Sequence, residues 1–247
     1  MVRRPQDERS PGYGNQPTPD LVPGPEVDLR VVLLTREQDR LLVALTGREP
    51  CEASAHAIGL PRGRPELRRD LDGTARGIAR RATGLSEQYL EQLYSMSVDQ
   101  STRGSWKVVI GYMALLSSGP GGSPDVSGVW ADVSKLPTVS RIDRSVIDYA
   151  VVRLRAKLGY TNIGRYLLPS TFTLRELQSV YETILGQPLD KRNFRRRMMA
   201  TGILAQTDGQ RRDGSHRPAA LYQFQVEEDR TTYLTPTWTD SDDTRRT

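Results

Sequence analysis

The sequence predicts an α+β protein with two folded parts in series. Short β-branched and leucine-rich runs dominate the first part, whereas helical apolar stripes followed by a hairpin pattern dominate the second. Both ends of the 247-residue chain are polar. The proline- and glycine-rich start buries too little apolar surface to order itself, so we expect a disordered tail at 1–27 and a polar C-terminal tail at 226–247.

The first part, 28–142, has the pattern of a mixed α/β domain. Three apolar runs predict strands: "LRVVLLT", "RLLVALT" and "WKVVIGYMALL". A fourth, short strand is expected in "GVWADVSKLP". The apolar spacing over 73–83 predicts a helix, and Gly84 stands where a C-cap glycine belongs.

From Asp143 the pattern becomes helical. The apolar residues between Val146 and Leu158 form one face of a helix, which we place at 143–160 as a linker helix. The residues leave two roles open for this helix: it joins two domains, or it lines a dimer interface.

The second part, 161–225, contains two further helices and a hairpin. In "TLRE", Thr173 and Glu176 form a capping box, which marks the start of one helix. Asp190 can cap the next helix, and "ILAQTDGQRRDGSHRPAALYQF" reads as strand, turn-rich loop and strand. This order of elements is the outline of a winged helix-turn-helix.

The helix after Asp190 carries an unusual basic cluster, "LDKRNFRRRMM". On a helix, Phe194 and Met198 face the core, which turns most of the arginines outward. Arginine can pair bidentately with guanine, and asparagine with adenine, while a basic hairpin tip can approach phosphates. The residues that we expect to contact DNA are Thr173, Lys191, Arg192, Asn193, Arg195, Arg196, Arg211, Arg212 and Arg217.

The positive charge is concentrated in this second part. Residues 160–225 hold ten Lys and Arg against five Asp and Glu, a net charge of +5. The formal charge of the whole chain is also +5, so the remainder is balanced. This concentration favours double-stranded nucleic acid as a partner.

Several classes of protein are excluded by composition. The single cysteine, Cys51, excludes an intrachain disulfide framework, and His56 and His216 provide no Cys/His cluster for structural zinc. No apolar run approaches the ~18 residues of a membrane span, and no signal-peptide pattern is present. We therefore expect a cytoplasmic protein with no membrane partner, associated with the nucleoid when bound to DNA.

The second half closely resembles the Nudix-related transcriptional regulators of NAD metabolism, the NrtR family. The matching stretches are "LRAKLGYTNIGRYLLPSTFTLRELQSVYETILGQPLDKRNFRRRM", "ATGIL" and "RPAALYQF", and the earlier "LPRG", "RGSWKVVIGYMALL" and "VWADVSKLP" look like Nudix landmarks. The resemblance implies an N-terminal Nudix-like α/β/α sandwich domain followed by a C-terminal winged helix-turn-helix domain. It also implies a homodimer that binds a palindromic operator near NAD-biosynthesis genes, with an ADP-ribose-type or NAD-related nucleotide as effector.

The Nudix box of that family type reads G-x5-E-x7-R-E-U-x-E-E-x-G-U, with U an apolar residue. Its glutamates lie along one helix and hold divalent metal at a pyrophosphate. When the box is aligned on Gly84, its four glutamate positions are Arg69, Ile78, Arg81 and Ala82. These residues cannot form a metal site, so we expect no hydrolysis, no metal and no cofactor.

Basic residues occupy or flank the altered box, and Asp70 and Asp72 are expected in the loop before the helix. The arginines are either a solvated helix face or a direct, metal-free contact to a nucleotide pyrophosphate, and the sequence leaves both open. The candidate effector-binding residues are Arg62, Arg64, Arg69, Arg81 and Arg103.

Three functions are compatible with these observations. The first is a transcriptional repressor of NAD biosynthesis and salvage genes. The second is a Nudix-like pyrophosphohydrolase with an accessory nucleic-acid-binding domain, against which the absent glutamates argue. The third is a nucleotide-sensing adaptor whose basic helix contacts an acidic protein.

Overall fold

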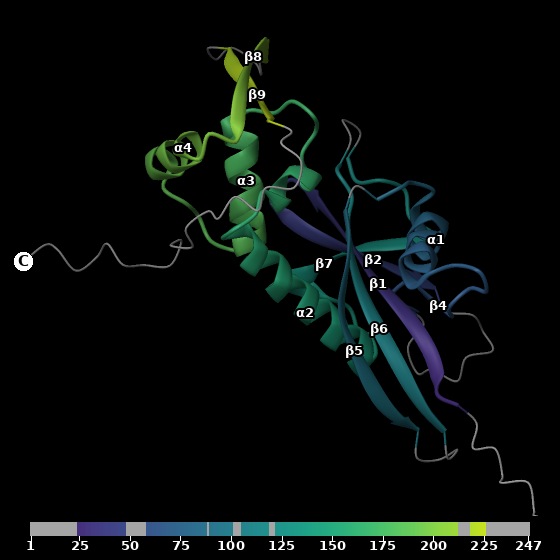
Figure 1. The fold of residues 1–247 in the computed structure, drawn as a ribbon. Coiled ribbons are helices and arrows are strands. Elements are labelled where there is room, and N and C mark those ends of the chain that lie inside the picture. The colour runs from purple at the N-terminus through teal and green to yellow at the C-terminus, as the bar shows by residue number, and fades with distance from the viewer. Residues whose placement is uncertain are drawn as a thin grey trace, which may run out of the picture.

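The computed structural model describes residues 24–47, 58–87, 89–100, 105–118, 122–211 and 218–225. Most of the predicted N-terminal tail and all of the predicted C-terminal tail lie outside this part, as do Cys51, His56 and His216. Within the described ranges, no helix is both long and apolar enough to cross a membrane. Figure 1 shows a layered N-terminal domain, with the C-terminal helices and hairpin beside one end of it.

A mixed sheet forms the centre of the N-terminal domain (Figure 1). Its strands, in spatial order, are β3 (Ile58–Gly59), β2 (Arg40–Gly47), β1 (Glu26–Glu37), β6 (Ser105–Leu115) and β5 (Tyr89–Gln100). Two short strands lie off this path: β4 (Arg62–Gly63) pairs with β1, and β7 (Gly128–Asp132) pairs with β2. β1 and β6 run parallel, whereas β2 and β5 are antiparallel to their neighbours.

The predicted strands are confirmed, β1 with an earlier start, whereas β3, β4 and β5 were not predicted. β1 begins at Glu26, inside the predicted disordered tail, because its first two residues pair with Lys107 and Val108 of β6. The longest of the strands that were not predicted, β5, has no strand signal in its sequence. This strand lies at the edge of the described sheet and includes polar residues such as Gln92 and Ser95, so it lacks the continuous apolar run of a central strand.

Helix α1 (Leu71–Thr83) covers one face of the sheet. Asp70 caps the helix by accepting a hydrogen bond from the backbone N of Gly73 at 2.7 Å, so the helix begins two residues before its predicted start. Asp72 therefore lies in the first helical turn, and its predicted position in the preceding loop is corrected. Gly84 ends the helix in the left-handed region, as predicted, with φ of 69°. The buried side of α1 packs on apolar residues of β1 and β6.

Helix α2 (Arg141–Leu158) covers the opposite face, where its buried residues form one apolar cluster with β1, β2 and β6. The helix that we placed at 143–160 as a linker is found at Arg141–Leu158, where it forms the third layer of an α/β/α sandwich. It also joins the two domains, which is one of the roles that the sequence left open. The Nε of Arg155 donates a hydrogen bond to the carbonyl oxygen of Ile184 in α3 (Leu174–Leu185) at 2.8 Å.

A buried ion cluster, which the sequence analysis did not predict, fixes the start of α2 to β1. The Arg30 guanidinium donates hydrogen bonds from Nε and Nη2 to Asp28 Oδ2, at 3.3 and 3.0 Å, and from Nη1 to Asp143. All three residues are buried, and Ser140 donates to the second carboxylate oxygen of Asp143 at 2.8 Å. Buried charges are tolerated when they are paired in this way, so the cluster holds the helix on the strand in one position.

The C-terminal domain has the predicted order of elements. It contains the 3-10 helix η2 (Ile163–Leu167), α3, α4 (Lys191–Ala200) and the hairpin strands β8 (Leu204–Arg211) and β9 (Ala219–Phe224). The capping box of α3 and the Asp190 cap of α4 are both formed, as predicted. Phe172 makes an isolated antiparallel bridge to Tyr222, which ties the segment before α3 to the hairpin.

The edge strand β5 is attached to α2 by polar contacts around Glu91. Arg153 and Lys157 lie 2.8 and 3.0 Å from its carboxylate, and the Tyr89 hydroxyl donates a hydrogen bond to it at 2.6 Å. Tyr89 also packs against Tyr166 of η2, with ring centroids 5.1 Å apart. The cluster therefore connects the sheet, the second helical layer and the beginning of the C-terminal domain.

This cluster is expected to make the stability of the protein sensitive to acid. Burial raises the pKa of Glu91, but hydrogen bonds from Tyr89, Arg153 and Lys157 outweigh burial and hold the pKa below its ordinary value of 4.5. Stability from this carboxylate is present above its unfolded pKa and is lost as pH falls through the lower folded pKa. Thermal unfolding across pH should therefore show that the deficit of Glu91→Gln against the parent shrinks in acid. A deficit that is the same at every pH, or one matched by the exposed-pair control Asp148→Asn, would contradict this.

Candidate nucleic-acid interface

Helix α4 is anchored by two buried side chains, as its sequence spacing predicted. Phe194 and Met198 are each 1% exposed. The Phe194 ring meets the edge of Tyr181 on α3, with ring centroids 5.3 Å apart. At the start of the helix, Asp190 accepts a hydrogen bond from the backbone N of Asn193 at 2.7 Å. These contacts fix both the axis and the rotation of α4 on the domain.

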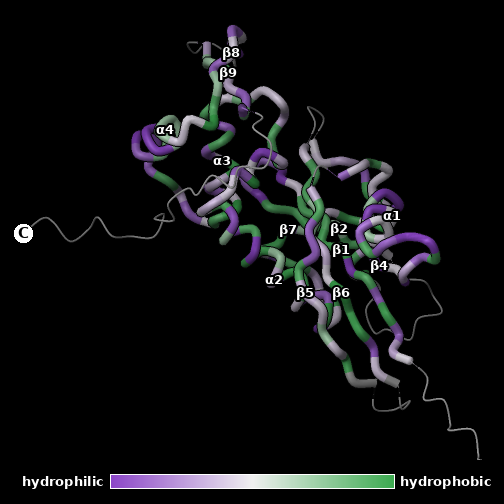
Figure 2. Tube along the Cα trace, in the orientation of Figure 1, coloured by the Kyte–Doolittle hydropathy of each residue, from purple (hydrophilic) through white to green (hydrophobic). Residues whose placement is uncertain are grey.

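The opposite face of α4 is exposed and cationic. Arg192, Arg195 and Arg196 are exposed, as predicted, and Figure 2 shows the hydrophilic character of this helix. Arg196 donates a hydrogen bond from Nη2 to the side-chain oxygen of Asn193 at 2.9 Å. Asn193 therefore orients a neighbouring guanidinium in addition to being available for its own contacts.

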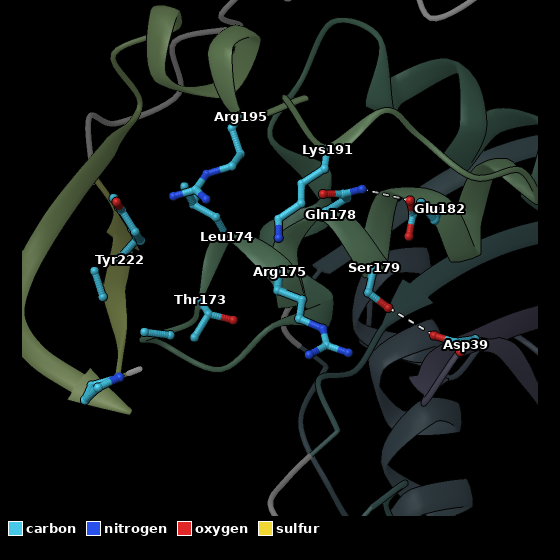
Figure 3. Close-up of a pocket in the computed structure, with 13 residues that line it drawn as sticks. Asp39, Thr173, Leu174, Arg175, Gln178, Ser179, Glu182, Lys191, Arg195 and Tyr222 are labelled. Carbon is cyan, nitrogen blue, oxygen red and sulfur yellow. Dashed lines mark hydrogen bonds between the residues drawn. The ribbon is translucent and has the colours of Figure 1, made fainter. Parts of the chain in front are cut away.

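A cleft of about 820 Å³ lies between α3, α4 and β9. Figure 3 shows Lys191 and Arg195 extending from α4 and Arg175 from α3 among the residues that line it. Asp39, in the turn between β1 and β2 of the N-terminal domain, also lines the cleft. The three cations outnumber the two lining carboxylates, Asp39 and Glu182, so the cleft has the net positive charge that an anionic backbone requires.

Arg175 is the cation of the cleft lining that was not among the predicted DNA contacts. It is exposed in the first turn of α3, between the two capping-box residues. A cation in that turn is opposed by the positive end of the helix dipole, so it does not serve the stability of the helix. That mismatch was a signal in the sequence that Arg175 has an external role.

Thr173, which we expect to contact DNA, caps the start of α3. The hydroxyl oxygen accepts a hydrogen bond from the backbone N of Glu176 at 3.1 Å, and the Thr173 backbone N donates to the Glu176 carboxylate at 2.7 Å. Only 6% of the residue is exposed, although it lines the cleft. Thr173 therefore shapes the cleft by fixing the start of α3.

Arg211 is held against the domain and does not lie on a free hairpin tip. Its Nη1 lies 2.6 Å from a carboxylate oxygen of Glu176, so the last residue of β8 is paired with the start of α3. A contact between Arg211 and DNA phosphates stays a prediction, which Arg211 would make from beside α3 and not from the tip. The other two predicted hairpin contacts, Arg212 and Arg217, lie outside the described residues.

The predicted effector-binding arginines that the structure describes fall into two pairs. Arg69, just before α1, and Arg81, in its last turn, each lie 3.0 Å from the carboxylate of Glu66. The segment before α1 is therefore folded back along the helix, and Figure 2 shows that it is hydrophilic. Arg103 lies outside the described residues.

The second pair faces β1 instead. Arg64 lies 2.9 Å from Glu26, and Arg62 lies 3.9 Å from Asp28. Because these contacts leave Arg64 exposed, the structure is compatible with a solvated basic surface and with an anion site. In the part of the chain that the structure describes, no three His, Cys, Asp or Glu side chains are grouped as metal ligands.

Comparison with known proteins gives matches to both domains. Residues 164–224 match the model of the NrtR DNA-binding winged helix domain. The ADPR responsive transcriptional repressor NtrR of Acinetobacter baylyi is 30% identical over 213 residues, which cover 83% of this chain and 84% of that protein. The chain belongs to the NrtR family.

Solved structures extend the likeness over most of the chain. Shewanella oneidensis NrtR complexed with a 27mer DNA is 27% identical, with a TM-score of 0.69 over 81% of this chain and 93% of that one. A MutT/nudix family protein from Enterococcus faecalis, 20% identical, shows the same fold with a TM-score of 0.57 over 83% and 89% of the two chains. As expected from the sequence, this NrtR-family chain is a Nudix-like domain followed by a winged helix domain.

Proposed function

We propose that this protein is a DNA-binding transcriptional repressor of NAD biosynthesis and salvage genes, which binds a palindromic operator as a homodimer. The single observation that carries the proposal is the cationic cleft on the winged helix domain, bordered by the exposed arginine face of α4. The names of the Acinetobacter and Shewanella relatives support the same class of function. A repressor acts on the chromosome, so we place the protein in the cytoplasm, at the nucleoid when bound.

The side chains on α3 and α4 around the cleft have two different roles in the proposed mechanism. Helix α4 enters the major groove, where Arg192 and Arg196 reach base edges and can pair bidentately with guanine. Arg175 and Lys191 neutralise phosphates on either side, which holds the helix in register without reading sequence. Because phosphate contacts release counterions, affinity should fall steeply as salt rises.

Selection from a random duplex library tests this function and identifies the operator in the same experiment. The full chain should enrich an inverted repeat whose half-sites are about 10 bp apart, or a multiple of that spacing, because a two-fold dimer presents two α4 helices. Enrichment of no sequence, together with binding that salt does not weaken, would contradict the repressor. It would favour the adaptor that contacts an acidic protein.

We also propose that an ADP-ribose-type nucleotide, bound by the Nudix-like domain, controls operator binding. Support comes from the name of the Acinetobacter relative, which calls it ADPR responsive, and from the two exposed arginines that share Glu66. A nucleotide pyrophosphate could replace this carboxylate as the anion between Arg69 and Arg81. A nucleotide that binds better to the arrangement that cannot bind DNA would release the operator.

Arg81→Ala and Arg69→Ala are expected to weaken ADP-ribose binding, each by about fivefold or more, because a charge-assisted contact to the pyrophosphate is lost. Calorimetric titration of the full chain measures this effect. Arg76→Ala is the matched control, since Arg76 is on the same helix but pairs with Glu87. Unchanged affinity in both variants would show that these arginines form only a solvated face.

We do not propose hydrolysis. The four positions that carry glutamate in a Nudix box hold Arg69, Ile78, Arg81 and Ala82 in this chain. Asp72, which lies on the same helix, accepts a hydrogen bond from the Tyr112 hydroxyl at 2.9 Å. Metal-dependent turnover of ADP-ribose would revive the pyrophosphohydrolase, and we expect none with Mg²⁺ or Mn²⁺.

A further inference from the structure

The end of β1 and the turn that follows it make a direct polar contact with the middle of α3. Arg36 donates a hydrogen bond from Nη2 to the Ser179 hydroxyl oxygen at 2.6 Å. The same hydroxyl donates to Asp39 Oδ1 at 3.1 Å, a contact that Figure 3 shows at the edge of the cleft. One serine of the winged helix domain is therefore held between a cation and an anion of the Nudix-like domain.

The helix that receives this contact is rigidly connected to α4. Gln178 donates from Nε2 to the carbonyl oxygen of Leu189 at 2.9 Å, and the backbone N of Leu189 donates to Glu182 at 2.9 Å. The Phe194 ring adds apolar contact with Tyr181. Any rotation of α3 about its attachment must therefore move α4 and its arginines with it.

A second polar contact also joins α3 to the sandwich, at a different point along the helix. It is the hydrogen bond from Arg155 to Ile184, close to the C-terminal end of α3. The buried side of α3 also packs in one apolar cluster with α2, β1 and β2, but apolar packing has no direction of its own, so the two polar contacts are what selects one orientation of the helix. Removal of the Arg36 contact should therefore allow the winged helix domain to tilt without unfolding.

The Arg36 side chain is only partly satisfied by its surroundings. Burial lowers the pKa of its guanidinium, against the opposing effect of Asp39 and Glu176, and its buried Nε has no hydrogen-bond partner among the described residues. Burial of an unsatisfied donor costs free energy, so this arginine does not give the fold its maximum stability. Its placement is better explained by the position that it imposes on α3.

We propose that Arg36 is a positioning residue for operator binding: through Ser179 it sets the orientation of the winged helix domain on the Nudix-like domain. The proposal rests on the proposed function. In a dimer, the two α4 helices bind two half-sites of one operator. Once the first α4 helix is bound, the relative placement of the two domains decides how strongly the second α4 helix binds the other half-site. Binding to a single half-site does not depend on that placement.

The test compares two duplexes, one with the full inverted repeat and one with a single half-site and scrambled flank. Arg36→Met and Ser179→Ala should each bind the full repeat about fivefold or more weakly than the parent, with single half-site affinity unchanged. The double variant should be no weaker than Ser179→Ala alone, because Ser179→Ala already removes the contact to Arg36 together with the one to Asp39. Arg40→Met is the matched control: it removes a cation from the end of the same turn, where Arg40 pairs with Glu37 and not with α3 in the described part of the chain.

The outcomes separate this inference from the proposed function. A parent chain that shows no preference for the repeat refutes the repressor itself. If the parent prefers the repeat but Arg36→Met and Ser179→Ala match it on both duplexes, the positioning role is refuted and the repressor stands. Equal losses on the two duplexes also refute it, since they indicate a direct DNA contact or a damaged winged helix. If Arg36→Met melts at a much lower temperature than the parent, its binding data reflect a damaged fold. The affinities of Ser179→Ala for the two duplexes then decide whether the positioning role stands.

Discussion

An Arg196→Ala variant is expected to lose about 1–3 kcal/mol of operator-binding free energy, which is roughly 5- to 150-fold in affinity. The side chain is exposed on the outer face of α4, and Asn193 already holds its guanidinium at 2.9 Å. Because this contact orders the arginine before DNA arrives, less conformational entropy is lost on binding. Arg192→Ala, on the same face, should show a loss of the same order.

Lys191→Ala is the comparison that distinguishes a contact to DNA bases from a contact to phosphates. A phosphate contact should weaken all duplexes by a similar factor and reduce the slope of log affinity against log salt by about 1. Arg196→Ala should instead reduce discrimination at one position of the operator. If Arg196→Ala binds the operator as tightly as the parent, α4 is not the recognition helix.

A Phe194→Ala variant is expected to lose about 3–5 kcal/mol of folding free energy, as large-to-small substitutions of buried aromatic residues do. Phe194 is 1% exposed and packs edge-on against Tyr181, so its removal leaves a cavity between α3 and α4. Chemical denaturation of the full chain, followed by far-UV circular dichroism, measures the loss. The winged helix domain should unfold at lower denaturant concentration than in the parent.

Met199→Ala is the matched control for this substitution. Met199 is the neighbour of the buried Met198 on the same helix, but 49% of it is exposed. Its removal should change stability by less than about 0.5 kcal/mol. Equal effects of Phe194→Ala and Met199→Ala would mean that the rotation of α4 differs from the one described.

Local signals in the sequence predicted the helices and several of their ends, although α1 and α2 each begin two residues before the predicted start. The capping box of Thr173 and Glu176, the cap at Asp190 and the left-handed Gly84 each involve residues within one turn of each other, so a short window contains the whole interaction. The edge strand β5 has no such signal, because its pairing partner is supplied by the fold. The apolar stripe of α2 showed that one face is buried but not which surface covers it.

In the candidate site too, local features could be predicted from the sequence, whereas contacts between distant segments could not. The spacing of Phe194 and Met198 was sufficient to predict which arginines of α4 point outward. The pairing of Arg211 with Glu176 spans 35 positions of the chain, and the contact between Arg36 and Ser179 spans 143. Contacts over such separations depend on how distant segments pack together, so no local pattern could have identified them.

The most direct test of the account is a fluorescence-anisotropy titration of the selected operator with the full chain, at two salt concentrations, with and without ADP-ribose. Binding is expected to be tight and specific against a scrambled duplex, weaker at the higher salt concentration, and released by the nucleotide. Specific binding that no nucleotide alters would remove the effector from the account and leave the repressor. Equal affinity for the operator and the scrambled duplex would contradict its central claim, that the arginine face of α4 reads DNA sequence.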